Sequence, residues 1–139
     1  MTELVVRRLI PIPRERVFNA WLDPERLARF MLPMTTGRAT AEVDPRVGGR
    51  FRILMFHQGT DEPGMEHSGE YLLIDRPARL AFTWRSPATD GIITVVTIDF
   101  VERGTGTEVV LTHDRLPPSA VDSHRKGWSD IVRLLGDVA

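Results

Sequence analysis

The apolar residues of the chain follow two different periods. In residues 14–30 and 117–138 they recur every three or four positions, which is typical of amphipathic helices. In residues 39–113 they alternate with polar residues, which is typical of β-strands. The pattern over 117–138 is the longest of the helical kind and predicts one main helix, whose apolar face must be buried against another element. That face comprises Val121, His124, Trp128, Ile131, Leu135 and Val138.

Seven strands and two short helices complete the predicted chain. A strand over residues 4–10 precedes a helix over 14–22, which Pro13 opens, and a second helix through residue 30, which Asp23 and Pro24 cap. Because the connections between the later strands are short, we expect neighbouring strands to be antiparallel. These later strands are predicted at residues 39–43, 50–56, 68–75, 79–85, 92–102 and 107–113, with loops at 31–37 and 57–67.

Alternation gives the sheet one apolar face and one polar face. An antiparallel sheet with one solvated face needs a cover on the other, and only the helix over 117–138 is long enough. The sequence therefore predicts one α+β domain over residues 1–139, with the element order β-α-α-β(six)-α. A curved antiparallel sheet of about six or seven strands surrounds the C-terminal helix, and one helix leaves part of such a sheet uncovered. We expect a cavity between the sheet and the helix.

Composition excludes several kinds of protein. The 139 residues contain no cysteine, which excludes disulfides, thiol nucleophiles and thiolate metal sites. The formal net charge of −1 predicts no general attraction to nucleic acid or to an anionic membrane. No apolar run approaches the roughly 18 residues of a membrane span. The N-terminus lacks the pattern of a signal peptide, so we expect a cytoplasmic protein.

Short motifs spread along nearly the whole chain resemble those of a known family. They are Pro13-Arg-Glu-Arg-Val-Phe-Asn-Ala-Trp21, Asp23-Pro24, Glu42-Val-Asp44, Gly48-Gly-Arg-Phe51, Gly69-Glu-Tyr71, Arg79-Leu-Ala-Phe-Thr-Trp84, Leu111-Thr-His113, Leu116-Pro117 and Gly127-Trp128. In this order they resemble the signature blocks of the activator of heat-shock-protein-90 ATPase homologue family, within the START-like (Bet v 1-like) superfamily. The resemblance implies the helix-grip fold. Phe30-Met-Leu-Pro33 stands where the family has a tryptophan-rich block, so we expect a thinner aromatic wall there.

His113 and His124 are the candidate polar groups of the cavity. Alternation turns His113 inward, and the helical period places His124 on the covering face, so the two side chains could converge at the cavity mouth. A functional interpretation is a hydrogen-bond donor or general base for a bound molecule. The alternative, favoured because no carboxylate partner is evident, is that each histidine satisfies nearby backbone groups. The four histidines form no metal-binding motif, so we expect neither a metal nor another cofactor.

The large apolar residues of the inner face either line the cavity or pack as core. Core packing is the default for any one of them, but as a group we interpret them as a cavity wall. Gly127 costs about 1 kcal/mol relative to alanine in the middle of a helix, so we expect it to allow a close approach by the sheet or by a ligand. The predicted cavity residues are Phe51, Ile53, Tyr71, Phe82, Trp84, Val96, Ile98, Phe100, Leu111, His113, His124, Gly127, Trp128 and Ile131.

Three functions follow as expectations. The first is a non-catalytic protein, monomeric or homodimeric, that holds a small hydrophobic molecule between the sheet and the C-terminal helix. The second rests on the resemblance and is a chaperone-associated module of the stress response. The third is a cyclase-type or hydrolase-type enzyme that uses His113 and His124. The superfamily hosts many activities, so the fold by itself does not choose among them.

Overall fold

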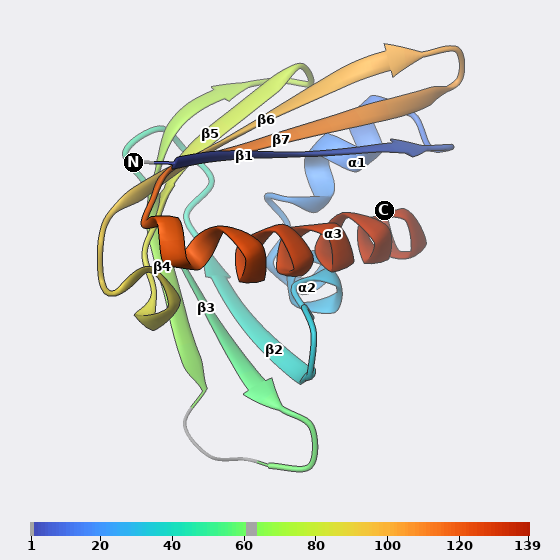
Figure 1. Cartoon of the computed structure of the whole chain (residues 1–139). Coiled ribbons are helices and arrows are strands. Elements are labelled where there is room, and N and C mark those ends of the chain that lie inside the picture. Colours follow the sequence, from blue (N-terminus) through green and yellow to red (C-terminus); the bar gives the residue numbers. More distant parts are fainter. Residues whose placement is uncertain (1, 61–63) are drawn as a thin grey trace.

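The computed structural model describes residues 2–60 and 64–139, and within them seven strands form one curved antiparallel sheet (Figure 1). The order across the sheet is β1-β7-β6-β5-β4-β3-β2, so β1 and β7 are the one neighbouring pair there that is not consecutive in sequence. The strands are β1 (Thr2–Ile10), β2 (Thr36–Val43), β3 (Arg50–His57), β4 (Met65–Asp75), β5 (Arg79–Trp84), β6 (Thr94–Arg103) and β7 (Gly106–Leu116).

Helices connect the strands and cover the concave side of the sheet. α1 (Arg14–Ala20) and α2 (Pro24–Phe30) link β1 to β2, and α3 (Val121–Val138) follows β7. Two 3-10 turns, η1 (Pro87–Thr89) and η2 (Pro118–Ala120), precede β6 and α3. In Figure 1 the sheet bends around α3, with β1 and β7 on one side of the helix and β2 and β3 on the other. This helix-grip arrangement confirms the predicted fold class and element order.

The residues predicted to start the two short helices lie at the starts of α1 and α2. Asp23 Oδ1 accepts a hydrogen bond from the backbone N–H of Glu25 at 3.1 Å, and Pro24 occupies the first helical position of α2. Pro13 immediately precedes α1 with an extended backbone. α1 is two residues shorter than predicted, because the chain leaves the helix at Trp21 and turns into the cap of α2.

The inward faces predicted from alternation are buried. Leu80, Phe82 and Trp84 of β5 are each at most 3% exposed, as are Trp128 and Leu135 of α3. Each large apolar side chain buried in this way contributes roughly 1.5–3 kcal/mol. The buried face of β6 and β7 comprises Thr94, Val96, Ile98, Phe100, Val109, Leu111 and His113. Burial of Trp128 and Leu135 therefore offsets the cost of the glycine in the middle of α3.

The predicted loop at residues 57–67 is wrong at both ends. β3 continues to His57, and β4 begins at Met65. Apolar alternation does not show these ends because polar residues occupy them, His57 in β3 and Glu66 and His67 in β4. β2 likewise begins at Thr36, inside the predicted loop at 31–37.

The boundaries around the two 3-10 turns also differ from the prediction. β6 begins at Thr94 instead of residue 92, because η1 and the left-handed Asp90 after it place Ile92 and Ile93 in an exposed turn. α3 begins at Val121, after η2, instead of at residue 117. Within residues 2–60 and 64–139, no helix combines the length and the hydropathy needed to span a membrane.

Candidate functional site

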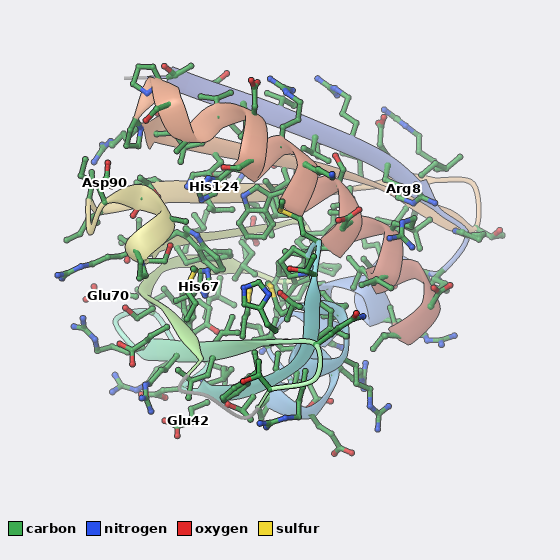
Figure 2. The ribbon with its side chains drawn as sticks, turned by 60° about the horizontal axis from the view of Figure 1, so that its bottom comes forward. Arg8, Glu42, His67, Glu70, Asp90 and His124 are labelled. Carbon is green, nitrogen blue, oxygen red and sulfur yellow. The ribbon has the colours of Figure 1, made fainter. Side chains whose placement is uncertain are left out.

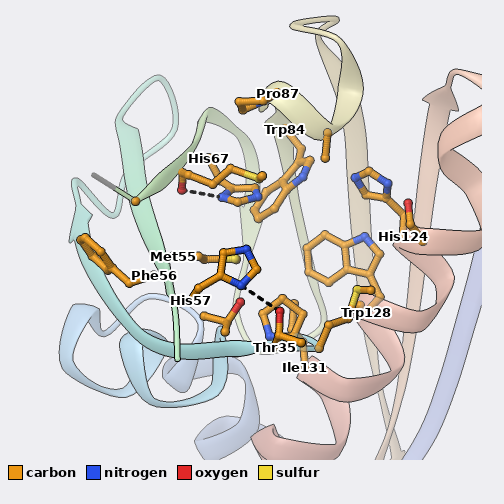
Figure 3. A pocket seen from close by; sticks show the side chains of 18 of the residues that line it. Thr35, Met55, Phe56, His57, His67, Trp84, Pro87, His124, Trp128 and Ile131 are labelled. Carbon is orange, nitrogen blue, oxygen red and sulfur yellow. Dashed lines mark hydrogen bonds between the residues drawn. The ribbon is translucent and has the colours of Figure 1, made fainter. Parts of the chain in front are cut away.

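A cavity of about 510 Å³ opens between α3 and the strands β2 to β4 (Figure 3). The segment before β2, the facing ends of β3 and β4, the end of β5, η1 and the first half of α3 wall this cavity. The lining residues are Pro33, Met34, Thr35, Thr36, Met55, Phe56, His57, Thr60, Gly64, Met65, His67, Trp84, Pro87, Ala88, Ser123, His124, Gly127, Trp128 and Ile131. None of these described residues is an aspartate, glutamate, lysine or arginine.

Charged side chains lie around the cavity instead of inside it. In Figure 2, Glu42, Glu70 and Asp90 lie at the outside of the molecule, whereas His67 and His124 lie within it. The acidic side chains that flank the cavity strands pair with arginines at the surface, as Glu66 does with Arg52 on β3. The described lining of the cavity is therefore apolar with a few neutral polar groups.

Gly127 borders the open side of the cavity. A Cβ built at this position would have only Pro33 Cβ within 4 Å, at an ordinary contact distance of 3.5 Å. No described strand approaches the helix here. The sequence predicts that the sheet or a ligand approaches the helix closely at this glycine. The structure excludes a close approach by the described strands.

Two indole rings form the inner wall. The ring centroids of Trp84 and Trp128 are 4.9 Å apart, and the Trp84 ring also lies 5.1 Å from the ring of His67. The Nε1–H of Trp84 is buried and has no hydrogen-bond partner among the described residues, which costs about 1–3 kcal/mol. Broad aromatic faces of this kind suit flat or aliphatic molecules.

A chain of hydrogen bonds holds Trp128 in place. Its Nε1–H donates to His113 Nδ1 at 2.9 Å, so the proton of neutral His113 is on Nε2. Nε2 then donates to Thr94 Oγ1 at 2.6 Å, and Thr94 Oγ1 donates to the carbonyl oxygen of Trp84 at 2.6 Å. Burial, reinforced by His124, lowers the pKa of His113 to about 3. His113 is thus a neutral residue with no free ring nitrogen for general-base chemistry.

His67 and His124 use their ring nitrogens in the opposite way. His67 Nδ1 lies 3.2 Å from the carbonyl oxygen of Met65, and His124 Nδ1 lies 2.8 Å from that of Ala120. A carbonyl oxygen can only accept, so each Nδ1 carries the proton and each Nε2 a lone pair. Among residues 2–60 and 64–139, no side chain hydrogen-bonds to Nε2 of either ring, and the backbone carbonyl of Ile53 also hydrogen-bonds to the ring of His67.

Burial keeps both of these imidazoles neutral. It outweighs the carbonyls of Met65 and Ile53 and lowers the pKa of His67 to about 4. It also lowers the pKa of His124. The ring of His124 lies 5.2 Å from the ring of His113, so these two side chains do converge. His124 lines the cavity, whereas His113 lies behind the cavity wall.

The mouth of the cavity is built from more adaptable groups. His57 Nδ1 lies 2.9 Å from Thr35 Oγ1, which joins the ends of β2 and β3. Met34 has a left-handed backbone (φ 55°), and its N–H donates to Asp130 Oδ2 of α3 at 2.9 Å. Unbranched thioether side chains adjust to irregular shapes. Three of them line the cavity, Met34, Met55 and Met65.

The family described as "Activator of Hsp90 ATPase homolog 1-like protein" matches residues 11–139 of this chain. The chain belongs to this family. No curated protein shows significant similarity to it. Protein CV1439 from Chromobacterium violaceum has 23% identity and a TM-score of 0.83, with 100% of this chain and 98% of that one covered.

Two further solved structures show the same fold. The AHSA1-like protein from Aeromonas hydrophila has 24% identity and a TM-score of 0.76, over 99% of this chain and 91% of that one. PFC0360w, an HSP90 activator from Plasmodium falciparum, has 24% identity and a TM-score of 0.73, over 93% of this chain and 89% of that one. At these identities the similarity establishes the fold of the Hsp90 activator homologue family and leaves activity open.

The residues predicted for the cavity of this family member fall into three groups. Those that line the cavity are Trp84, His124, Gly127, Trp128 and Ile131. A second group surrounds a deeper void of about 10 Å³ together with Trp84, and comprises Phe51, Ile53, Tyr71 and Phe82. The third group forms the buried inner face of β6 and β7, away from the cavity lining. It comprises Val96, Ile98, Phe100, Leu111 and His113.

Some lining residues were not predicted from the sequence. His57 and His67 were assigned to a loop, although extending the alternation of Tyr71 and Gly69 back by two residues would have turned His67 inward. In place of the family's tryptophan-rich block, Phe30 packs on Trp21 with ring centroids 5.0 Å apart. The described residues contain no group of three or more histidine, aspartate or glutamate side chains arranged to hold a metal ion.

Proposed function

We propose that this protein binds one small hydrophobic molecule, without chemical conversion, in the cavity between its sheet and α3. The observation that carries the proposal is a cavity of about 510 Å³ walled by two indoles and three methionines. Ligand pockets typically measure roughly 300–1,000 Å³ and are mostly apolar, with a few polar groups. A binding role without catalysis is supported by His113, because both ring nitrogens of this candidate base are engaged.

A pair of glycine substitutions on α3 tests this proposal. The measurement is the fluorescence titration of a neutral apolar probe, N-phenyl-1-naphthylamine. A leucine at Gly127 projects into the cavity, and filling that space is expected to weaken probe binding at least about 10-fold. Gly136→Leu is the matched control, because a Cβ there meets only Ile10 at 3.8 Å and lies outside the cavity lining.

Circular dichroism of both variants checks that the fold is retained. Native mass spectrometry of freshly purified protein, compared with the denatured mass, is expected to show an apolar cargo. If the unaltered protein binds neither the probe nor any cargo, the proposal fails. If Gly127→Leu binds the probe as tightly as the unaltered protein, the molecule is held somewhere else.

A second candidate function is binding to the Hsp90 chaperone. It is supported by the family description and by the similarity of fold to the HSP90 activator from Plasmodium falciparum. The test is the steady-state ATPase rate of purified Hsp90 with increasing amounts of this chain. An increase in rate supports the chaperone function. If the rate is unchanged and the two proteins do not co-purify, this candidate is excluded.

A further inference from the structure

We propose that the cavity selects uncharged apolar molecules that carry a hydrogen-bond donor, such as the hydroxyl group of a phenol or alcohol, and that Nε2 of His124 or of His67 accepts this hydrogen. The inference rests on the proposed binding function and adds the chemical class of the ligand. It follows from the orientation of the two imidazoles and from the absence of charged residues in the described lining.

The two imidazoles lie at one end of the cavity. Figure 3 shows His67 and His124 on either side of Trp84, and the ring centroids of His67 and Trp84 are 5.1 Å apart. Each Nδ1–H is already committed to a backbone carbonyl, that of Met65 or that of Ala120. Nε2 of His124 therefore presents a bare lone pair, and no described side chain donates to Nε2 of either imidazole.

A ligand donor is the group that completes this arrangement. A ligand that fills the cavity displaces water from the acceptor, and a hydroxyl or N–H of the ligand restores the hydrogen bond that is lost. Burial holds the pKa of His67 near 4, so its lone pair is present at neutral pH. A donor-free molecule of the same shape fills the cavity but leaves Nε2 unpaired.

A carboxylate is disfavoured for two reasons. The described lining contains no lysine or arginine that could balance its charge, so the desolvation of the anion is not repaid. Its oxygens would also face the Nε2 lone pair of His124, and the unpartnered Nε1–H of Trp84 in the described lining is neutral and cannot balance the charge. The neutral histidines thus distinguish alcohols and phenols from acids of similar shape.

Three probes of nearly equal shape test the selectivity of the unaltered protein at pH 7: 2-naphthol, 2-methoxynaphthalene and 2-naphthoate. Isothermal titration calorimetry gives the three dissociation constants. One hydrogen bond restored in the cavity is expected to make 2-naphthol bind about 5- to 10-fold tighter than 2-methoxynaphthalene. The anion 2-naphthoate is expected to bind more weakly than either.

Two substitutions then assign the acceptor atoms. His67→Phe and His124→Phe each keep an aromatic ring but remove Nε2, and the variant that loses the accepting Nε2 is expected to bind 2-naphthol about 5-fold more weakly. Binding of 2-methoxynaphthalene should stay the same, which also shows that the cavity of the variant is intact. Lys126→Ala, on the exposed side of α3, is the control and should leave all three constants unchanged.

The outcomes separate this inference from the proposed function. If none of the three probes binds, both fail. If 2-naphthol and 2-methoxynaphthalene bind equally well, the cavity is a binding site but the donor selectivity is refuted. Tightest binding of 2-naphthoate, or unchanged selectivity in both phenylalanine variants, also overturns the inference. The comparison of probes on the unaltered protein decides the matter even if one of the variants does not fold.

Discussion

The histidines near Trp84 and Trp128 differ in which ring nitrogen keeps its proton. Trp128 donates to Nδ1 of His113, which leaves the proton on Nε2. Backbone carbonyls accept from Nδ1 of His67 and His124, which leaves Nε2 bare. A histidine in the core, His113, therefore has both ring nitrogens engaged, whereas the two at the cavity wall offer Nε2 as an acceptor.

Opposite tautomers can be observed directly. Long-range ¹H–¹⁵N NMR spectra at neutral pH are expected to show His113 as the Nε2–H tautomer, and His67 and His124 as the Nδ1–H tautomer. Trp128→Phe removes the donor to His113 Nδ1, so it should mix the tautomers of His113. His67 is the internal control, because its carbonyl partner is unaffected by this change. An Nδ1–H signal from His113 in the unaltered protein would contradict the proposed bond chain.

The sequence pattern predicts the positions of these side chains but not which ring nitrogen carries the proton. Alternation and the helical period placed His113 and His124 together, and their rings lie 5.2 Å apart. The tautomer of His113 depends on the indole of Trp128, which reaches it only when α3 packs on β7. No local pattern encodes a contact between residues from two different elements.

At the scale of elements, one hydrogen-bond chain joins α3 to three strands. It runs from Trp128 on α3 through His113 on β7 and Thr94 on β6 to the carbonyl of Trp84 on β5. Every member is at most 3% exposed. A fully satisfied network of this kind specifies one docking position of the helix, which also orients the indole of Trp128 at the cavity wall.

Thr94→Val tests the central link of this chain. The change preserves the shape of the side chain, but it leaves His113 Nε2–H and the Trp84 carbonyl without their partner. The free energy of unfolding is expected to fall by about 1–3 kcal/mol, as measured by urea denaturation. Thr97→Val is the matched control on the outer face of the same strand, and its effect should stay within about 0.5 kcal/mol. Equal effects of the two changes would show that the network adds no stability.

Helices and central strands were predicted well because their signals are local. Asp23 and Pro24 start α2 with groups that lie next to each other in the chain. The ends of β3 and β4 were missed because polar residues, His57 in β3 and Glu66 and His67 in β4, give no apolar alternation there. The cavity residues contributed by those ends were missed for the same reason.

At the scale of the whole molecule, the position of the cavity follows from uneven cover of the sheet. α1 packs on β6 and β7, where Phe18 meets Phe100 with ring centroids 5.1 Å apart, and α3 packs on β1 and α2. Figure 1 shows β2, β3 and β4 extending away from α3 on the other side. The inner residues of β6 and β7 are therefore core, and those at the ends of β3 and β4 line the cavity. Periodicity identifies inward faces but cannot show which part of the face the helices leave open.

The buried neutral histidines make the stability of the whole domain depend on pH. His67 and His113 have folded-state pKa values of about 4 and about 3, below their ordinary value of 6.5. Burial is the main cause of both lowered pKa values, and His124 lowers the pKa of His113 further. No carboxylate contributes to either shift. In the unfolded chain both histidines bind a proton as the pH falls below 6.5, whereas in the folded protein they stay neutral.

Stability should therefore be full above about pH 7 and be lost as the pH falls from 6.5 toward 4. Each such histidine contributes a slope of about 1.4 kcal/mol per pH unit in this window, so the pair gives about 3 kcal/mol per unit. Urea denaturation between about pH 5 and pH 6.5 reports on the buried histidines, because exposed carboxylates remain ionised there, and His124, whose pKa is also lowered, adds to the slope in the same direction. His67→Phe is expected to remove about 1.4 kcal/mol per unit from the slope. A free energy of unfolding that stays constant over this range would mean that the two imidazoles are accessible to protons in the folded state.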